Sequence, residues 1–383
     1  MNGEGAGRRE ADRTAAGDGR NIDPQVGILE GEGSEQAVPK DRAAQEGAAP
    51  YGVWDRLPTP RPDDRDVTYY DRPAIKEPVW IWAVPTYFYV GGTAGAAAVL
   101  GAATQIAGGE DLRGLVTRCR RIAALGDMVG TGLLVYDLGR PGRFLNMLRV
   151  FRPTSPMSVG SWVLAASTPM TSSSARLANA HGWRRTAGDL AGLGAGLAGM
   201  PLAGYTAVLL SNTAVPVWQG TRRSLPVLFV ASAMSGAASL LDLMDLGARE
   251  ERVVRRFGIL GRVAEMGAML AVEREAGQVE RVGRSLHEGV SGALWKAAKG
   301  LTAASLLASV LPGRTRGKRA ASGVLGTVGS LALRFAVFHA GKSSARDPRA
   351  TFHQQRLGHG AAEVTGRPAI AAGRALGIPT SKL

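Results

Sequence analysis

The fold is decided by residues 84–107, VPTYFYVGGTAGAAAVLGAATQIA, which contain no charged side chain. At 1.5 Å of rise per residue, a helix of this length crosses the ~30 Å hydrocarbon core of a bilayer. Trp80, Trp82, Tyr87 and Tyr89 crowd its beginning, as aromatic side chains do at the boundary between lipid and water. The stretch therefore predicts a transmembrane helix whose first residues lie at a membrane surface.

Seven more apolar segments follow, at residues 122–138, 157–175, 187–214, 225–246, 257–272, 292–311 and 320–340. The sixth is the weakest, because Arg262 and Glu265 interrupt it. Many segments are rich in Gly, Ala and Ser, and the pair Gly192 and Gly196 has the spacing that lets helix backbones approach closely in a membrane. We therefore expect an all-α, polytopic integral membrane protein with about eight transmembrane helices.

Composition divides the chain into four parts. Residues 1–50 are polar and are expected to be disordered, and no apolar stretch typical of a signal peptide follows the start. Residues 51–83 combine aromatic residues with prolines and predict an extended arm at the membrane interface. Residues 84–340 are expected to form the membrane domain, and residues 341–383 a basic, flexible C-terminal tail.

The formal net charge of +14 does not indicate a nucleic-acid partner. The basic residues lie mainly between apolar segments, where Lys and Arg anchor helices at lipid headgroups. The loops after the first, third, fifth and seventh segments are short and basic, which favours an external N-terminus. Only seven of the 46 basic residues are Lys, and Ala and Gly abound, which suggests a GC-rich bacterial genome and hence a bacterial cytoplasmic (inner) membrane.

The single cysteine, Cys119, excludes an internal disulfide, a Cys-ligated iron–sulfur cluster and a structural zinc site in this chain. The five histidines include no pair within facing membrane segments, so a bis-His haem is not expected either. We therefore expect no metal, haem or iron–sulfur cluster in this chain, and any such electron carrier must come from a partner.

Ionisable side chains inside a bilayer cost about 2.5–3.5 kcal/mol at its centre, so each needs a reason. Asp127 lies a third of the way into the second segment. Its role is open between proton transfer and a structural hydrogen bond between helices. Asp189, Asp245 and His339 lie near segment ends, where the simplest expectation is that they reach the headgroups.

Two polar blocks, residues 69–82 before the first segment and 137–153 after the second, are expected to meet at one membrane surface, because an even number of crossings separates them. Together they offer Glu77, Asp137, Arg140, Arg143 and Asn146, beside several aromatic side chains that include Trp80. Aromatic walls with nearby charged groups suit a flat ligand that has a polar head. The alternative is a cluster of salt bridges at helix ends with ordinary aromatic anchors.

The same residues carry a family resemblance. It rests on YYDRPAIKEPVWIWAVPTYFYVGGTAG (69–95), LVYDLGRPGRFLNMLRVFRPTSPMSVGSW (134–162) and YTAVLLSNTAVPVWQGTRRSLPVLFVASAMSGAASLLDL (205–243). These stretches resemble the polysulfide reductase membrane-subunit family (NrfD/PsrC type), over roughly residues 68–340. The family has eight membrane helices, which agrees with the independent count of apolar segments.

The resemblance implies a membrane anchor that is not catalytic alone and that exchanges electrons between a quinone pool, menaquinone or ubiquinone, and an iron–sulfur partner. That ferredoxin-like subunit would serve a molybdenum or tungsten bis-pterin (molybdopterin) catalytic subunit, in respiratory complexes similar to polysulfide, nitrite, tetrathionate or formate oxidoreductases. Quinone chemistry couples two electrons to two protons, so the site needs hydrogen-bonding groups and a proton route.

The resemblance also implies roles for particular residues. The quinone head group would lie near the start of the first helix, where Tyr87 stands in the place of a His found in some members, with Tyr205 as the second tyrosine. Trp80 and Asn146 are further candidates for quinone contacts. Glu77, Asp137 and Asp127 are candidates for proton exchange, with Arg140 orienting Asp137.

Two other functions stay open from the sequence. One is a pure anchor that docks the iron–sulfur subunit without quinone turnover. The other is a proton-coupled membrane transporter that uses Asp127 and Asp242, although the sequence shows no internal repeat of the kind transporters often have.

Overall fold

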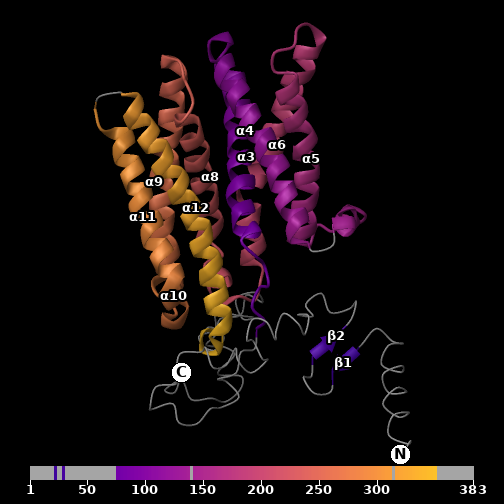
Figure 1. Ribbon diagram of the computed structural model, residues 1–383, viewed down its shortest axis with the longest axis vertical. Coiled ribbons are helices and arrows are strands. Elements are labelled where there is room, and N and C mark those ends of the chain that lie inside the picture. The colour runs from indigo at the N-terminus through magenta and orange to yellow at the C-terminus, as the bar shows by residue number, and fades with distance from the viewer. Residues whose placement is uncertain (1–20, 24–27, 31–74, 139–140, 313–314, 352–383) are drawn as a thin grey trace, which may run out of the picture. The chain divides into compact units, whose positions relative to one another are not determined.

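The computed structural model describes residues 21–23, 28–30, 75–138, 141–312 and 315–351 (Figure 1). The chain divides into two units, Met1–Tyr69 and Tyr70–Leu383. In the first unit, β1 (Asn21–Asp23) and β2 (Ile28–Glu30) pair antiparallel, with Asn21 opposite Glu30. The sequence did not indicate these two strands, and the rest of the expected disordered region and most of the expected arm lie outside the described residues.

The second unit is helical, and its described residues contain eight helices of 19 residues or more. They are α3 (Ala83–Ala107), α4 (Arg113–Asp137), α5 (Pro156–Arg176), α6 (Trp183–Ser211), α8 (Ser224–Asp242), α9 (Ala248–Ala276), α11 (Gly289–Val310) and α12 (Arg316–Arg346). Short helices η2 (Glu110–Leu112), η3 (Pro141–Leu148), α7 (Pro216–Gly220) and α10 (Glu280–His287) lie between them. Four of the eight, α3, α6, α8 and α12, are long and apolar enough to cross a membrane by length and composition. The all-α membrane fold is confirmed.

Three helices differ most from their expected bounds. Helices α4 and α9 begin nine residues earlier than their apolar segments, at Arg113 and Ala248, and α12 continues to Arg346, into the stretch expected to be a flexible tail. The added turns are charged, and ion pairs to other elements compensate those charges, as between Arg118 and Glu250 at 2.9 Å. An apolar segment read from the sequence ends at such charged residues, whereas the helix continues through them.

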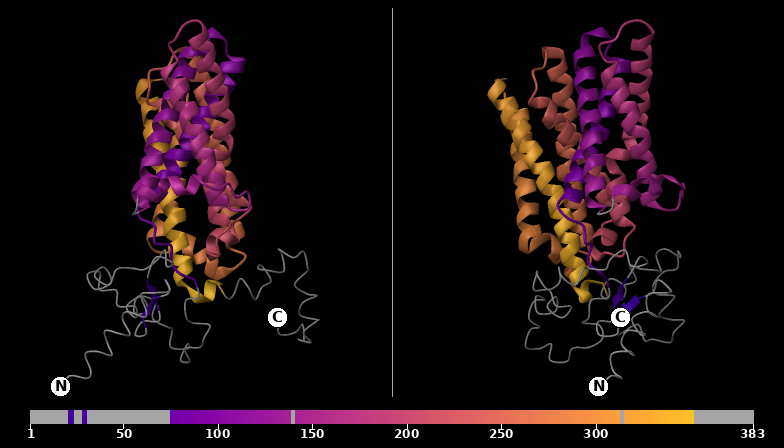
Figure 2. Two further views of the ribbon diagram at one scale, coloured as in Figure 1. Left: turned by 90° about the vertical axis from the view of Figure 1, so that its right-hand side faces the viewer. Right: turned by 45° about the vertical axis from the view of Figure 1, so that its right-hand side comes forward.

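The helices form two four-helix bundles (Figure 2). Helices α3, α4, α5 and α6 pack around one axis, and α8, α9, α11 and α12 around another. Helix α3 contacts both α8 and α12, and α6 contacts α8, so these contacts join the bundles. Both bundles begin with a helix that runs in the same direction, and α3 is shared between them.

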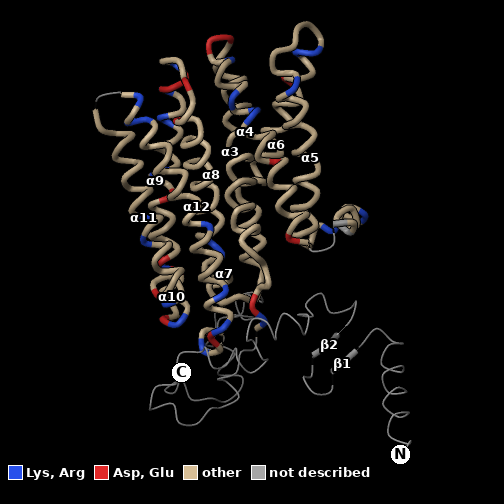
Figure 3. The backbone as a smooth tube through the Cα atoms, in the orientation of Figure 1, with Lys and Arg blue, Asp and Glu red and all other residues tan. Residues whose placement is uncertain are grey.

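The helix connections separate two ends of the molecule, which we name for use below. The loop end holds the α3–α4, α5–α6, α8–α9 and α11–α12 connections, and the arm end holds residues 75–82, η3, α7 and α10. Charged residues gather toward these two ends, with fewer along the middle of the helices (Figure 3). This distribution is the one that a bilayer imposes on a spanning bundle.

Glycines bring α3 and α6 into backbone contact. A Cβ atom on Gly95 would lie 2.6 Å from the Gly199 carbonyl oxygen, and one on Gly199 would lie 2.6 Å from the Gly95 carbonyl oxygen. Gly196, of the predicted close-packing pair, faces Ala98 and Ala102 of α3. Small residues therefore supply the close helix contact that association in lipid requires.

We expect Gly199→Ala to destabilise the bundle by about 1–3 kcal/mol, because the added methyl group has no space and must push α3 and α6 apart. The measurement is the thermal unfolding of the purified chain in detergent. Gly300→Ala in α11 is the matched control, since nothing lies within 4 Å of its Cβ position and alanine favours the helix. Equal stability of the two variants would contradict the close contact.

Candidate functional site

Trp80 fixes the end of the arm to the bundle. Its ring stacks on Trp218 of α7, with centroids 5.9 Å apart and planes 18° apart, and meets Phe88 edge-on at 6.5 Å. The Trp218 indole in turn donates a 2.9 Å hydrogen bond to the Val337 carbonyl oxygen of α12. The arm thus reaches both bundles through one aromatic contact.

Glu77 pairs with the end of α12. Its carboxylate accepts hydrogen bonds from both Nε and Nη2 of Arg346, at 2.5 and 2.8 Å, and Lys342 Nζ lies 3.6 Å away. A bidentate guanidinium–carboxylate pair is a strong and directional contact. For Glu77, this geometry favours the salt-bridge alternative over proton exchange.

Asp137 is the last residue of α4, and its Oδ1 accepts a long hydrogen bond, 3.4 Å, from the Ile81 amide. Beside it, the Trp82 and Tyr136 rings lie 6.0 Å apart. The charge of Lys342, which contacts Glu77, also acts on Asp137. The two polar sequence blocks therefore meet at the arm end, with both carboxylates near one lysine.

One sequence candidate, Asn146, is not brought into this group. Asn146 lies exposed in η3, which packs on α4 and α5, and its carbonyl oxygen accepts from the Arg149 amide at 3.3 Å. Arg140 lies outside the described residues, so its expected contact with Asp137 stays a prediction.

Tyr87 of α3 and Tyr205 of α6 form a hydrogen bond between their hydroxyl groups inside the first bundle. Tyr87 is 2% exposed. Glycines of the other two helices leave room for the rings: a Cβ atom on Gly130 of α4 would lie 3.2 Å from the Tyr87 ring, and one on Gly160 of α5 would overlap the Tyr205 ring. All four helices of the bundle therefore shape the space around this tyrosine pair.

Asp127 lies one turn before Gly130 on α4, and its charge acts on Tyr87. The side chain is fully buried, and its Oδ2 accepts hydrogen bonds from Ser167 at 2.6 Å and Thr171 at 2.9 Å on α5. Its Oδ1 has no partner among the described residues. Asp127 thus makes the hydrogen bonds between helices that the structural hypothesis predicts. It also keeps one acceptor oxygen free beside the tyrosine pair.

Sequence reasoning missed several residues that complete these groups. Ser167 and Thr171 were not singled out, although their spacing of four places two hydroxyls on one face of an apolar helix. Arg346, Lys342 and Trp218 were missed because they lie far along the chain from their partners, and no local pattern connects them.

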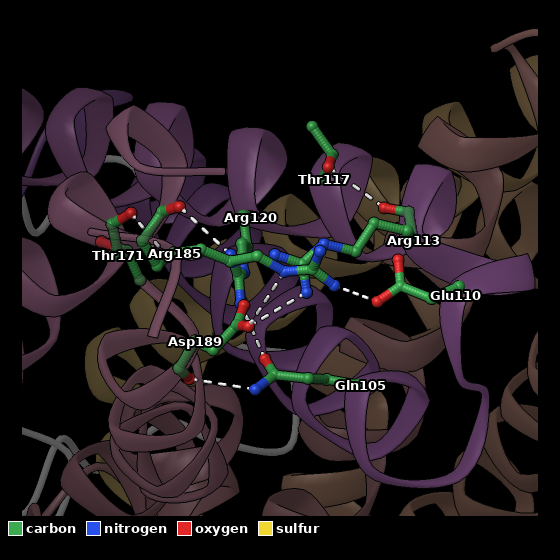
Figure 4. Close-up of polar contacts among 9 residues, drawn as sticks. Gln105, Glu110, Arg113, Thr117, Arg120, Thr171, Arg185 and Asp189 are labelled. Carbon is green, nitrogen blue, oxygen red and sulfur yellow. Dashed lines mark hydrogen bonds and ion pairs between the residues drawn. The ribbon is translucent and has the colours of Figure 1, made fainter. Parts of the chain in front are cut away.

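A second charged cluster lies at the loop end of the first bundle (Figure 4). Asp189 accepts from Arg113 at 3.0 Å and from Arg120 at 2.7 Å, and Arg185 Nε lies 3.9 Å away. Gln105 of α3 joins by accepting from Arg120 and donating to the Asp189 carbonyl oxygen. Asp189 thus joins α3, α4 and α6, rather than simply reaching the headgroups as expected.

The phenols and the free carboxylate oxygen provide the polar groups that a quinone needs. One phenol hydrogen is used within the tyrosine pair, which leaves the other available as a donor to a carbonyl oxygen. The free Oδ1 of Asp127 offers a nearby place for a proton. The residues present therefore fit a quinone head group.

Comparison with known proteins identifies a family. The model of the family described as polysulphide reductase, NrfD, matches residues 73–344, more than half of the chain. A search of curated proteins gave no match.

Proposed function

Because the chain belongs to the polysulphide reductase NrfD family, whose members are membrane subunits of quinone-linked oxidoreductase complexes, we propose that it is the quinone-binding subunit of such a complex. In this role it passes electrons between the quinone pool of a bacterial cytoplasmic membrane and a ferredoxin-like iron–sulfur subunit. That partner serves a molybdenum or tungsten bis-pterin catalytic subunit.

The observation that carries the proposal is the group formed by the buried Tyr87 and Asp127 and the half-buried Tyr205. A bound quinone supplies chemistry that takes up or releases two electrons and two protons. The phenol of the tyrosine pair whose hydrogen is not used within the pair would donate a hydrogen bond to a quinone carbonyl oxygen, and the Asp127 carboxyl would receive or return a proton.

The arm end has a separate task in the proposal. Trp80 and the Glu77–Arg346 pair hold the arm against both bundles, which fixes the start of α3 and with it the position of Tyr87. Asp137 lies half-buried at the same surface and exchanges protons with the water outside. In this proposal Glu77 anchors the arm, and Asp137 transfers protons.

The direct test is photolabelling of the purified complex with a photoreactive quinone analogue, followed by peptide mapping. We expect label on peptides of α3 and α6 around Tyr87 and Tyr205, and competition by menaquinone or ubiquinone. Label confined to lipid-facing positions, with no competition, would favour the anchor-only function. Co-purification with a ferredoxin-like protein is expected as well, whereas isolation as a stable lone homo-oligomer would favour a transporter.

We expect Asp137→Asn to slow quinol-linked electron transfer while the complex still assembles, because the amide removes a proton acceptor and keeps the shape and the bond from Ile81. The rate is measured as quinol-dependent reduction of the catalytic subunit, and assembly by gel filtration. Normal turnover in this variant would remove Asp137 from the mechanism.

A further inference from the structure

A second buried acid lies in the other bundle, away from the tyrosine pair. Arg262 and Glu265, the residues that made the sixth apolar segment the weakest, are both fully buried on α9. Neither contacts the candidate quinone site in the hydrogen bonds and ion pairs of the described residues. Buried charges inside a membrane helix are costly and need a function or a strong partner.

The charge of Arg334 on α12 acts on Glu265, but the two side chains make no hydrogen bond or ion pair with each other. Both of its carboxylate oxygens lack a partner among the described residues, and so do Nε and Nη1 of Arg334 on α12. Arg334 is 1% exposed, donates from Nη2 to the Phe229 carbonyl oxygen at 2.9 Å, and lies over the Phe229 ring at 3.8 Å. The guanidinium is thus held in place while half of its donors stay available.

Five hydroxyl groups gather around this pair, and none of them makes a hydrogen bond of good geometry in the described part of the chain. They belong to Tyr89 and Thr93 of α3, Ser232 and Ser235 of α8, and Thr327 of α12. The two serines lie beside the Glu265 carboxyl, and Tyr89 lies between the two threonines and Arg334. Polar atoms from α3, α8, α9 and α12 therefore converge on one interior position, which is the arrangement that holds internal water.

A line of polar contacts leads from Glu265 to the loop end. Arg262, one turn before Glu265, donates to Asp242 at 3.1 Å, Ser239 at 3.0 Å and Ser309 at 3.0 Å. Asp242 and Ser309 also line a cleft at the loop end, whose other charged residues are Glu251, Arg255, Lys318 and Arg319. The polar contacts of the cleft therefore extend to Arg262, one helical turn from the buried acid.

We propose that Glu265 is a proton-binding site inside the second bundle, hydrated together with Arg334 and reached from the loop-end cleft by water that passes the side chains of Asp242 and Arg262. A proton enters from the solution at the cleft, the carboxylate becomes the neutral acid, and Arg262 and Arg334 keep their charges. The charged groups that act on Glu265 are Arg334 of α12 and Arg262 of α9 itself, with the Tyr89 phenol of α3 beside them. The site requires no quinone.

The site also relates to the proposed function through α3. Tyr87 and Tyr89 are two residues apart, so they project to different sides of this shared helix. One side faces Tyr205 of the first bundle, and the other faces Arg334 of the second. The two polar groups are therefore neighbours on one helix while remaining separate sites.

The test is labelling of the full-length chain in lipid nanodiscs with dicyclohexylcarbodiimide, which reacts with protonated carboxyl groups in apolar surroundings. Peptide mass spectrometry is expected to find the adduct on Glu265, in an amount that falls as the pH rises. Absence of the adduct on Glu265 at every pH, in a sample in which another buried acid is labelled, would overturn the proposal.

Three variants test whether the labelling depends on Glu265 and Arg334. Glu265→Gln should lose the adduct on that peptide, and Arg334→Gln should keep labelling to a pH about one unit higher or more, because the nearby cation no longer favours the charged acid. Asp127→Asn, in the first bundle, should leave the pH dependence of Glu265 labelling unchanged. Failure of the quinone proposal therefore does not decide whether Glu265 binds a proton. A labelling profile that Arg334→Gln does not move would also refute the pair. Glu265→Met, which has no carboxyl group, replaces Glu265→Gln if the latter does not fold.

Discussion

Replacing Asp127 with Asn should lower quinol-linked electron transfer about a hundredfold while the complex still assembles. The asparagine keeps the size of the side chain, and its amide oxygen still accepts the hydrogen bonds from Ser167 and Thr171. What is lost is the ability of the carboxyl group to take up a proton next to the tyrosine pair. The rate is measured by stopped-flow reduction with a quinol, and assembly by gel filtration with the partner subunits.

Matched threonine variants on α5 control for damage to the helix. Thr171→Val removes a hydroxyl that donates to Asp127, whereas Thr168→Val removes one that donates to the Leu164 carbonyl oxygen of its own helix. We expect the first to alter the rate and its pH profile and the second to alter neither. A wild-type rate in Asp127→Asn would assign Asp127 to structure alone.

Replacing Asp189 with Asn should lower the free energy of unfolding by about 3 kcal/mol, the largest stability effect we expect in the first bundle. The exchange removes the negative charge that compensates Arg113 and Arg120, and Arg120 is only 4% exposed. A buried guanidinium without its counter-charge strongly destabilises the folded state. Denaturant unfolding of the purified chain measures the effect.

Glu110→Gln is the control for that experiment. Glu110 also pairs with an arginine of the cluster, Arg185, but its side chain is 75% exposed. Exposed pairs contribute about 0–1 kcal/mol, so the control should unfold close to the wild type. Equal losses in the two variants would mean that burial of Arg120 does not set the cost.

The architecture was largely readable from the sequence, because eight apolar segments became eight long helices. The bounds of α4 and α9 were not, since their first turns are charged and are compensated by residues of other elements. The pair between Arg118 and Glu250 joins residues 132 positions apart. The hydropathy of a short stretch of sequence contains no information on partners that lie so far away along the chain.

The candidate site shows the same limit. The resemblance singled out Tyr87 and Tyr205, but the bond between them joins residues 118 positions apart and rests on glycines in two further helices. Glu77 was predicted to exchange protons because nothing in the local sequence indicates its salt-bridge partner. That partner, Arg346, lies 269 positions away along the chain. Residue type suggested the chemistry, and only the packing distinguishes an anchor from a proton carrier.

The partners of α4 have a consequence for how the chain is made. Arg120 and Asp127 depend on Ser167, Thr171 and Asp189, all of which are synthesised later than α4 itself. During insertion, α4 therefore leaves the translocon before the counter-charge of Arg120 and the hydrogen-bond donors of Asp127 have been synthesised, and these partners arrive only with α5 and α6. We expect chains truncated before α6 to be retained by the insertion machinery or degraded, so the first bundle is a unit of biogenesis as well as of structure.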